Sequence, residues 1–393
     1  MSQLLNERWS ETKEALLEGL QGNRRQSMSV CLENTRKYLA ESATAGATST
    51  GNIATLNRVI LPVIRRVMPT VIANEIVGVQ PMTGPVAQIH TLRVRYADTS
   101  SGDSVVAGDE ALSPFKLAAA YSGNNNNSNP KAQTTSVLEG QVGKRMSIQI
   151  LKAPVEAKSR KLSARWTFEA AQDAQAMHGI DIEAEIMAAL AQEITAEIDQ
   201  EILASLRGLG TVEQTYDQAA VSGTATFVGD EHAALAVQIN RVANLIAQRT
   251  RRGAANWAVV SNQALTILQS ATTSAFARTT EGTFEAPTNT KFVGTLNNSM
   301  KIYVDAYLSD TDDNNQILVG YKGPSEADAA AFYCPYIPLM SSGVVLDPAT
   351  FEPVVGFLTR YGYVELTNTA SSLGNAADYL GKVAITSANV SFR

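Results

Sequence analysis

The chain has 393 residues, of which 45% are hydrophobic and 18% charged, a balance typical of a globular protein with a substantial core. Its net charge of -6 at pH 7 argues against a dedicated nucleic-acid-binding protein, which would normally be positively charged. A charged N-terminal stretch and the lack of any run of about 18 apolar residues argue against a secretory signal and a membrane span. Cys31 and Cys334 show no metal-ligand spacing, so we expect reduced thiols in a cytosolic setting.

The N-terminal segment, residues 1–41, carries two short amphipathic helical patterns that break at Gly22. Residues 42–55 are small and polar and predict a flexible joint. The chain then becomes apolar and basic together up to residue 79, and Arg65 and Arg66 stand side by side on a short helix after a proline.

Residues 87–155 alternate apolar and polar residues near both ends. In the first alternating run Arg93 and Arg95 share one face of a predicted strand. The stretch between the two runs, 97–145, is rich in Gly, Ser and Asn and shows no core pattern. We therefore expect a two-stranded arm with an irregular tip, which needs a neighbour to lie on. The returning strand places three apolar side chains on one face: Met146, Ile148 and Ile150.

The strongest secondary-structure prediction is a helix from Asp181 to about Gly208. Asp181 is a good N-cap, Arg207 suits the C-terminal end, and no Pro or Gly interrupts the helix. Its apolar residues recur at every fourth position, so the apolar stripe winds slowly around the axis. This pattern predicts a strut about 40 Å long that several parts of the protein pack against.

A strand pattern with Lys158 and Arg160 at its start precedes this helix, and residues 209–231 are polar and typical of a linker. An α/β region follows over residues 233–325, with two helices and three strands in alternation. The remaining residues, 326–393, are rich in strand patterns.

No pattern in the chain predicts catalysis, a cofactor or a metal ion. The histidines His90, His178 and His232 belong to no metal-binding spacing, and no nucleophile elbow accompanies them. The stretch from Gly140 to Lys144 has the wrong glycine spacing for a phosphate loop. We therefore predict a protein that is not an enzyme, and an enzyme of unrecognised type is the weakest alternative.

Three blocks of the sequence resemble the major capsid proteins of T-even-like tailed phages, in the same order along the chain. The first is LPVIRRVMPTVIANEIVGVQPMTGPV, the second runs from PVEAKSRKLSARWTFEAAQD to HGIDIEAEI, and the third from VGYKGPSEADAAAFYCPYIPL to FEPVVGFLTRYGY. The resemblance implies the Johnson fold of tailed-phage and herpesvirus shells, which is an α+β fold. It implies these parts: a helical segment and possible propeptide (1–41), an N-terminal arm (42–86), an extended β-hairpin loop (87–155), a peripheral domain (156–232) with a spine helix (181–207), an α/β axial domain (233–325), and C-terminal strands that return to the peripheral domain (326–393).

The implied function is a major capsid protein whose hexamers form the icosahedral head around a double-stranded DNA genome. The DNA would be enclosed without sequence-specific binding, and the expected location is the virion head, assembled in the host cytoplasm. Expected partners are further copies of the chain, vertex, portal and scaffold proteins, and a prohead protease. Two alternatives stay open: a paralogous pentameric vertex protein, and a nanocompartment shell protein of the same fold.

The resemblance also implies candidate sites. The family protease cuts after Glu in a Leu/Ile-x-Glu pattern, which Leu39, Ala40 and Glu41 match immediately before Ser42. The pattern also occurs at Leu16-Leu17-Glu18 and at Leu5-Asn6-Glu7. For charged contacts between subunits we expect six residues, with solvent-exposed surface as the alternative: Arg65, Arg66, Arg93, Arg95, Lys158 and Arg160.

Overall fold

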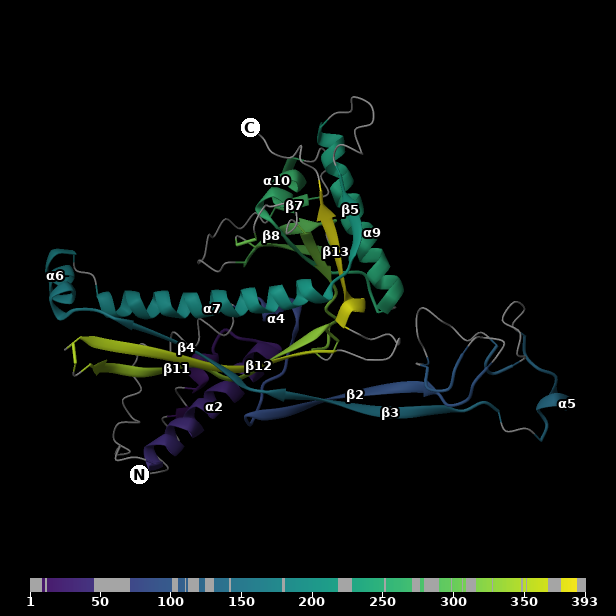
Figure 1. Ribbon diagram of the computed structural model, residues 1–393, viewed down its shortest axis with the longest axis horizontal. Coiled ribbons are helices and arrows are strands. Elements are labelled where there is room, and N and C mark those ends of the chain that lie inside the picture. Colours follow the sequence, from purple (N-terminus) through teal and green to yellow (C-terminus); the bar gives the residue numbers. More distant parts are fainter. Residues whose placement is uncertain are drawn as a thin grey trace.

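Helix α7 (Ile182–Leu209) links two sheets in the computed structural model, and a long hairpin extends away from both (Figure 1). One sheet lies along α7, and the other stands at its C-terminal end. The structure describes residues 9–10, 13–45, 71–100, 105–109, 111, 120–123, 131–140, 143–178, 181–217, 228–250, 252–270, 276–278, 290–297, 299–305, 307–308, 316–326, 328–347, 349–350, 352–366 and 376–386.

The first sheet has four strands in the order β1-β11-β12-β4. Strand β1 runs parallel to β11, and the other neighbours are antiparallel. Alternate residues of β12 are buried, as expected for a strand with one face against a core. The strands are β1 (Gly78–Val79), β11 (Ala331–Leu346), β12 (Pro353–Glu365) and β4 (Lys158–Arg165).

Helix α7 has 28 residues and agrees with the sequence prediction at both ends. The carboxylate of Asp181 caps it by accepting from the amides of Glu183 and Ala184, at 3.1 and 3.4 Å. The apolar stripe is buried from Leu190 to Leu206, because the first sheet covers its first part and the second sheet covers its end. A shorter helix, α6 (Phe168–His178), precedes it.

The second sheet has seven strands in the order β5-β13-β10-β6-β9-β8-β7, with helices α9 and α10 beside it. Trp257 at its centre is buried and lies over Gly320, where a Cβ atom would come within 2.2 Å of the indole. The elements are β5 (Val212–Tyr216), α9 (Val228–Thr250), β6 (Trp257–Val260), α10 (Asn262–Ser270), β7 (Phe276–Arg278), β8 (Thr290–Leu296), β9 (Met300–Asp305), β10 (Gln316–Gly320), the 3₁₀ helix η2 (Ala376–Tyr379) and β13 (Leu380–Ile385).

Strands β5 and β13 differ from the expected division of the chain. The sequence assigned residues 212–216 to a linker and all of 326–393 to strands that return to the first unit. In the structure β13 pairs with β10 on one side and with β5 on the other, so both belong to the second sheet. The physical reason is that a strand's partner lies far away in sequence, and its own alternation does not reveal that partner.

The hairpin pairs β2 (Val86–Tyr96) with β3 (Met146–Glu156), in antiparallel register from Val86 opposite Glu156 to Tyr96 opposite Met146. The short helix α5 (Thr135–Leu138) lies near its tip. The sequence predicted no core there, but four described residues form a small buried cluster: Tyr96, Val105, Ala111 and Tyr121. The two tyrosine rings lie 4.5 Å apart, and the hydroxyl of Tyr121 donates to the carbonyl of Arg145 at 2.6 Å.

The N-terminal helix α2 (Gly22–Ala45) packs against the first sheet. It continues past Glu41, the predicted end of the N-terminal helical segment. Cys31 and Leu32 are almost fully buried, and the amide of Asn34 donates to the carbonyls of Met82 and Tyr336, at 2.7 and 3.1 Å. Helix α2 is therefore part of the main hydrophobic core. In the described part of the chain, none of the helices could cross a membrane.

Candidate functional site

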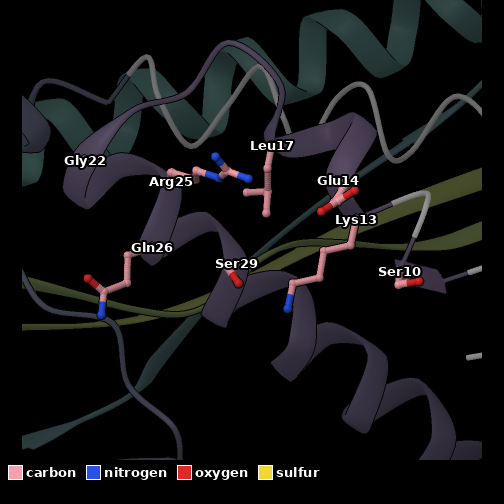
Figure 2. A pocket seen from close by; sticks show the side chains of 8 residues that line it. All are labelled: Ser10, Lys13, Glu14, Leu17, Gly22, Arg25, Gln26 and Ser29. Atoms are coloured by element: carbon pink, nitrogen blue, oxygen red, sulfur yellow. The ribbon is translucent and has the colours of Figure 1, made fainter. Parts of the chain in front are cut away.

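A shallow hollow lies between the N-terminal helical turn at residues 13–17 and the start of α2 (Figure 2). Its lining includes Lys13, Glu14, Arg25 and Gln26, and Lys13 pairs with Glu33 outside the hollow at 3.3 Å. The hollow is open to solvent. Among the described residues, no three His, Cys, Asp or Glu side chains gather in a way that could hold a metal ion.

The predicted contact residues lie in different settings. Arg65 and Arg66 fall outside the described residues. Arg93 stands on β2 opposite Gln149, and its side chain is also outside the described part. Arg95 is half-buried. None of these positions tests a contact with another subunit, so that role stays a prediction.

Arg160 on β4 is held within its own chain. Its guanidinium donates to Glu197 at 2.8 Å and to Glu201 at 2.6 Å, both on α7, and to the hydroxyl of Tyr361 on β12 at 2.6 Å. Tyr361 in turn donates to Glu201. Burial opposes the charge on Glu201, but the hydrogen bonds from Tyr361 and Arg160 outweigh it and lower the pKa of that carboxyl. The network fastens α7 to the four-stranded sheet.

We expect Arg160→Ala to lower the free energy of unfolding by about 1 kcal/mol, because Glu197 and Glu201 lose their shared cation in a partly exposed site. Urea unfolding of the subunit would measure the change. The matched control is Lys161→Ala, an exposed cation on the same strand, which should change stability very little. Equal effects from the two variants would contradict a special role for Arg160.

A second network joins α2 to the seven-stranded sheet through α4 (Ala73–Ile76). The carboxylate of Glu75 pairs with Arg24 of α2 and with Lys301 of β9, the latter at 3.1 Å, and accepts from the hydroxyl of Tyr303 at 3.2 Å. The ammonium of Lys322 donates to the carbonyl of Asn74 at 2.8 Å. Helix α4 thus connects three parts of the fold: α2, β9 and the segment that follows β10.

Two buried carboxylates lie where α7 meets β9. Asp305 is fully buried and accepts from Gln200 at 2.9 Å, from Arg207 at 2.8 Å and from the amide of Tyr307 at 3.1 Å. Asp199 is 1% exposed and accepts from the amide of Ile72 at 2.9 Å. Burial, together with the nearby charge of Asp305, raises the pKa of Asp199 to about 7, although the Ile72 amide opposes the shift.

Sequence reasoning missed Asp199 because it is one of many carboxylates on α7 and does not belong to the apolar stripe. A signal was nevertheless present. Asp199 falls in a second four-residue series beside the apolar stripe, and its neighbours in that series are all buried: Ala191, Thr195 and Leu203.

Two groups of exposed apolar side chains lie on elements at opposite ends of the molecule, the β2–β3 hairpin and the region of α6 (Figure 1). Along the hairpin, the predicted apolar face of β3 is open to solvent, with Ile148 69% exposed. We call this the arm face, defined as Met146, Ile148 and Ile150. At the other end, α6 and the C-terminal end of β11 carry a second group of exposed apolar side chains, the distal patch, with Met177 80% exposed. The distal patch comprises Phe168, Met177, Val344, Val345 and Leu346.

Comparison with known proteins gives consistent matches. The family "Major capsid protein Gp23" matches residues 53–385. The major capsid protein of Vibrio phage KVP40 is 29% identical, over 85% of this chain and 81% of its own length. That of Enterobacteria phage T4 is also 29% identical, over 83% and 78% respectively. Among solved structures, the capsid of Myoviridae phage XM1 is 10% identical with a TM-score of 0.45, covering 79% of this chain and 88% of that chain.

The family match confirms the resemblance to T-even-like capsid proteins and spans both sheets and the hairpin. The α+β fold class is confirmed as well. The protein is a structural subunit of a phage head rather than an enzyme. The chain belongs to the Gp23 family of major capsid proteins.

Proposed function

We propose that copies of this chain join head to tail into hexamers, and that the hexamers close into an icosahedral head around double-stranded DNA. The observation that carries this proposal is the pair of different apolar surfaces, the arm face and the distal patch, at opposite ends of one subunit. When two different surfaces of one chain bind each other, repetition of the contact generates a ring if the rotation closes.

The arm itself supports this arrangement. An isolated two-stranded ribbon is marginally stable, and exposed contiguous apolar surface commonly marks an interaction site. We infer that the arm of one subunit lies over the distal patch of the next, while the seven-stranded sheets meet around the hexamer axis. Charged contacts from Arg93, Arg95 and Lys158 would flank the apolar one, whereas Arg160 already has three partners within its chain.

The other proposed partners follow from the same role. Vertex and portal proteins would complete the shell, a scaffold protein would guide assembly in the host cytoplasm, and a prohead protease would cut after Glu41. The net charge of -6 suits DNA that is enclosed rather than tightly bound, because phosphate binding requires clustered cations. The intact mass of subunits from mature heads would test the cut, since a processed chain begins at Ser42.

The test of the head-to-tail contact is Ile148→Asp. We expect a folded, soluble subunit that no longer forms hexamers or shells, because the buried contact would enclose an unpaired charge. Electron microscopy and analytical ultracentrifugation would measure assembly, and circular dichroism would check the fold. The matched control is Gln149→Asp, on the opposite face of the same exposed strand, which should still assemble. Normal shells from Ile148→Asp would refute the proposed contact.

The same two surfaces would also allow a ring of five subunits. The alternative of a pentameric vertex protein therefore differs from the proposed function in the number of copies per particle. A nanocompartment shell would differ in its content, because its particles would lack genomic DNA. Counting subunits per particle and measuring nucleic acid in purified particles separate these functions.

A further inference from the structure

The junction between the two sheets contains a cluster of buried polar groups, which we call the inter-sheet joint: Ile72, Asp199, Gln200, Arg207 and Asp305. Three elements meet here. Helix α7 contributes most of the side chains, β9 ends at Asp305, and the segment before α4 contributes the amide of Ile72. The hydrogen bond from the amide of Ile72 to Asp199 is the contact by which this joint holds residues 71–79 to α7.

The joint contains two carboxylates but a single cation among the described groups in contact with them. Arg207 donates to Asp305, which also accepts from a side-chain amide and a backbone amide. Asp199 has the amide of Ile72 as its described donor. A charge on Asp199 would therefore face Asp305 in a site closed to water, and a buried carboxylate without a cation strongly prefers its protonated form.

Among the described residues, the phenol of Tyr333 on β11 also faces Asp199. Burial raises the pKa of Tyr333 well above its ordinary value, so the phenol stays neutral at physiological pH. Behind it lies Cys31 of α2, and burial raises the pKa of that thiol to about 12. Neither group offers a positive charge, so among the described groups around Asp199 a proton is the means of neutralising it.

We propose that the inter-sheet joint is a pH-sensitive clamp on residues 71–79, closed while Asp199 carries a proton and loosened when Asp199 is ionised. Residues 71–79 include α4, whose Glu75 ties α2 to β9. The amide of Val79 is bound at 3.0 Å to Glu326, near the start of β11. Loosening the clamp would therefore weaken the connection between the N-terminal helix and both sheets.

Proton linkage sets the direction and the size of the effect. In the open state Asp199 would titrate near its ordinary value of 3.8, whereas in the closed joint its pKa is about 7. Between these values opening releases one proton, so the opening equilibrium constant should rise roughly tenfold per pH unit. Above pH 7 Asp199 is ionised in both states, and the constant should become level.

Hydrogen exchange followed by mass spectrometry would test the clamp in the full-length subunit. The reporter is the peptide covering residues 71–79, measured at pH 5, 6, 7 and 8, with exchange rates corrected for the intrinsic effect of pH. We expect the corrected exchange to rise roughly 50-fold from pH 5 to pH 7 and to level off at roughly 100-fold above pH 7. Strand β6 at the centre of the second sheet provides an internal reference that should show no such trend.

Two variants identify the responsible group. Asp199→Asn cannot ionise and should remove the pH trend at residues 71–79, whereas Glu193→Gln, an exposed carboxylate on the same helix, should leave it unchanged. If Asp199→Asn fails to fold, the pH profile of the wild type still decides, since a flat profile overturns the proposal. A trend that persists unchanged in folded Asp199→Asn would also overturn it.

Discussion

A subunit that begins at Ser42 should be roughly 5 kcal/mol less stable than the full chain before assembly, because it loses the buried face of α2. Met28, Cys31 and Leu32 are each at most 1% exposed, and each contributes its side chain to the main core. Asn34 also satisfies two backbone carbonyls at the edge of the first sheet. Chemical denaturation of the purified, unassembled subunit would measure the loss.

Point variants distinguish the contribution of buried α2 side chains from the effect of removing the whole segment. We expect Leu32→Ala to cost about 2–5 kcal/mol, the usual range for a buried leucine. Arg25→Ala, on the exposed side of the same helix, is the matched control and should cost very little. A truncated chain that unfolds at the same denaturant concentration as the full chain would show that α2 does not stabilise the subunit.

The predicted protease site lies inside this helix, since α2 extends from Gly22 to Ala45 and includes Glu41 and Ser42. If the proposed cut occurs, the released segment would uncover apolar surface on the first sheet and the carbonyls of Met82 and Tyr336. This apolar surface would have to be buried against another protein surface. Neighbouring subunits lie close by in an assembled shell, so cleavage within the shell would meet this requirement better than cleavage of free subunits.

Local signals accounted for the features that sequence reasoning predicted well. The N-cap at Asp181 and the four-residue apolar series determine α7 without help from distant residues. Strict alternation similarly predicted β3 and its exposed face at Met146, Ile148 and Ile150. These patterns arise within one element, so the chain segment alone contains the information.

The features that sequence reasoning missed depend on distant partners. Strand β13 pairs with β5, which lies well over 150 residues earlier in the chain, and neither strand's alternation specifies the other. The tip cluster likewise requires Tyr96 and Tyr121 to meet across an irregular stretch. Asp199 was not recognised as buried because its burial depends on β9 and on the segment before α4.

Asp199→Asn should stabilise the subunit at neutral and alkaline pH, by up to roughly 4 kcal/mol, and should change little near pH 4. The pKa of Asp199 is about 7 in the folded chain and near its ordinary value of 3.8 when unfolded, so between these values the folded state holds one more proton. The stability that this group contributes is therefore present below about pH 4 and is lost as the pH rises to about 7. Asparagine keeps an acceptor for the amide of Ile72 without a charge.

The decisive measurement is the difference in unfolding free energy between variant and wild type, determined by denaturant titration from pH 4 to pH 8. Taking the difference cancels every group that titrates alike in both proteins. It should rise through the window and become level above pH 7, because Asp199 is then ionised in both states of the wild type. Glu193→Gln should give a flat difference, since its side chain is exposed on the same helix. A flat difference for Asp199→Asn would mean that the pKa of Asp199 is the same in the folded and the unfolded chain, which would contradict the proposed protonation.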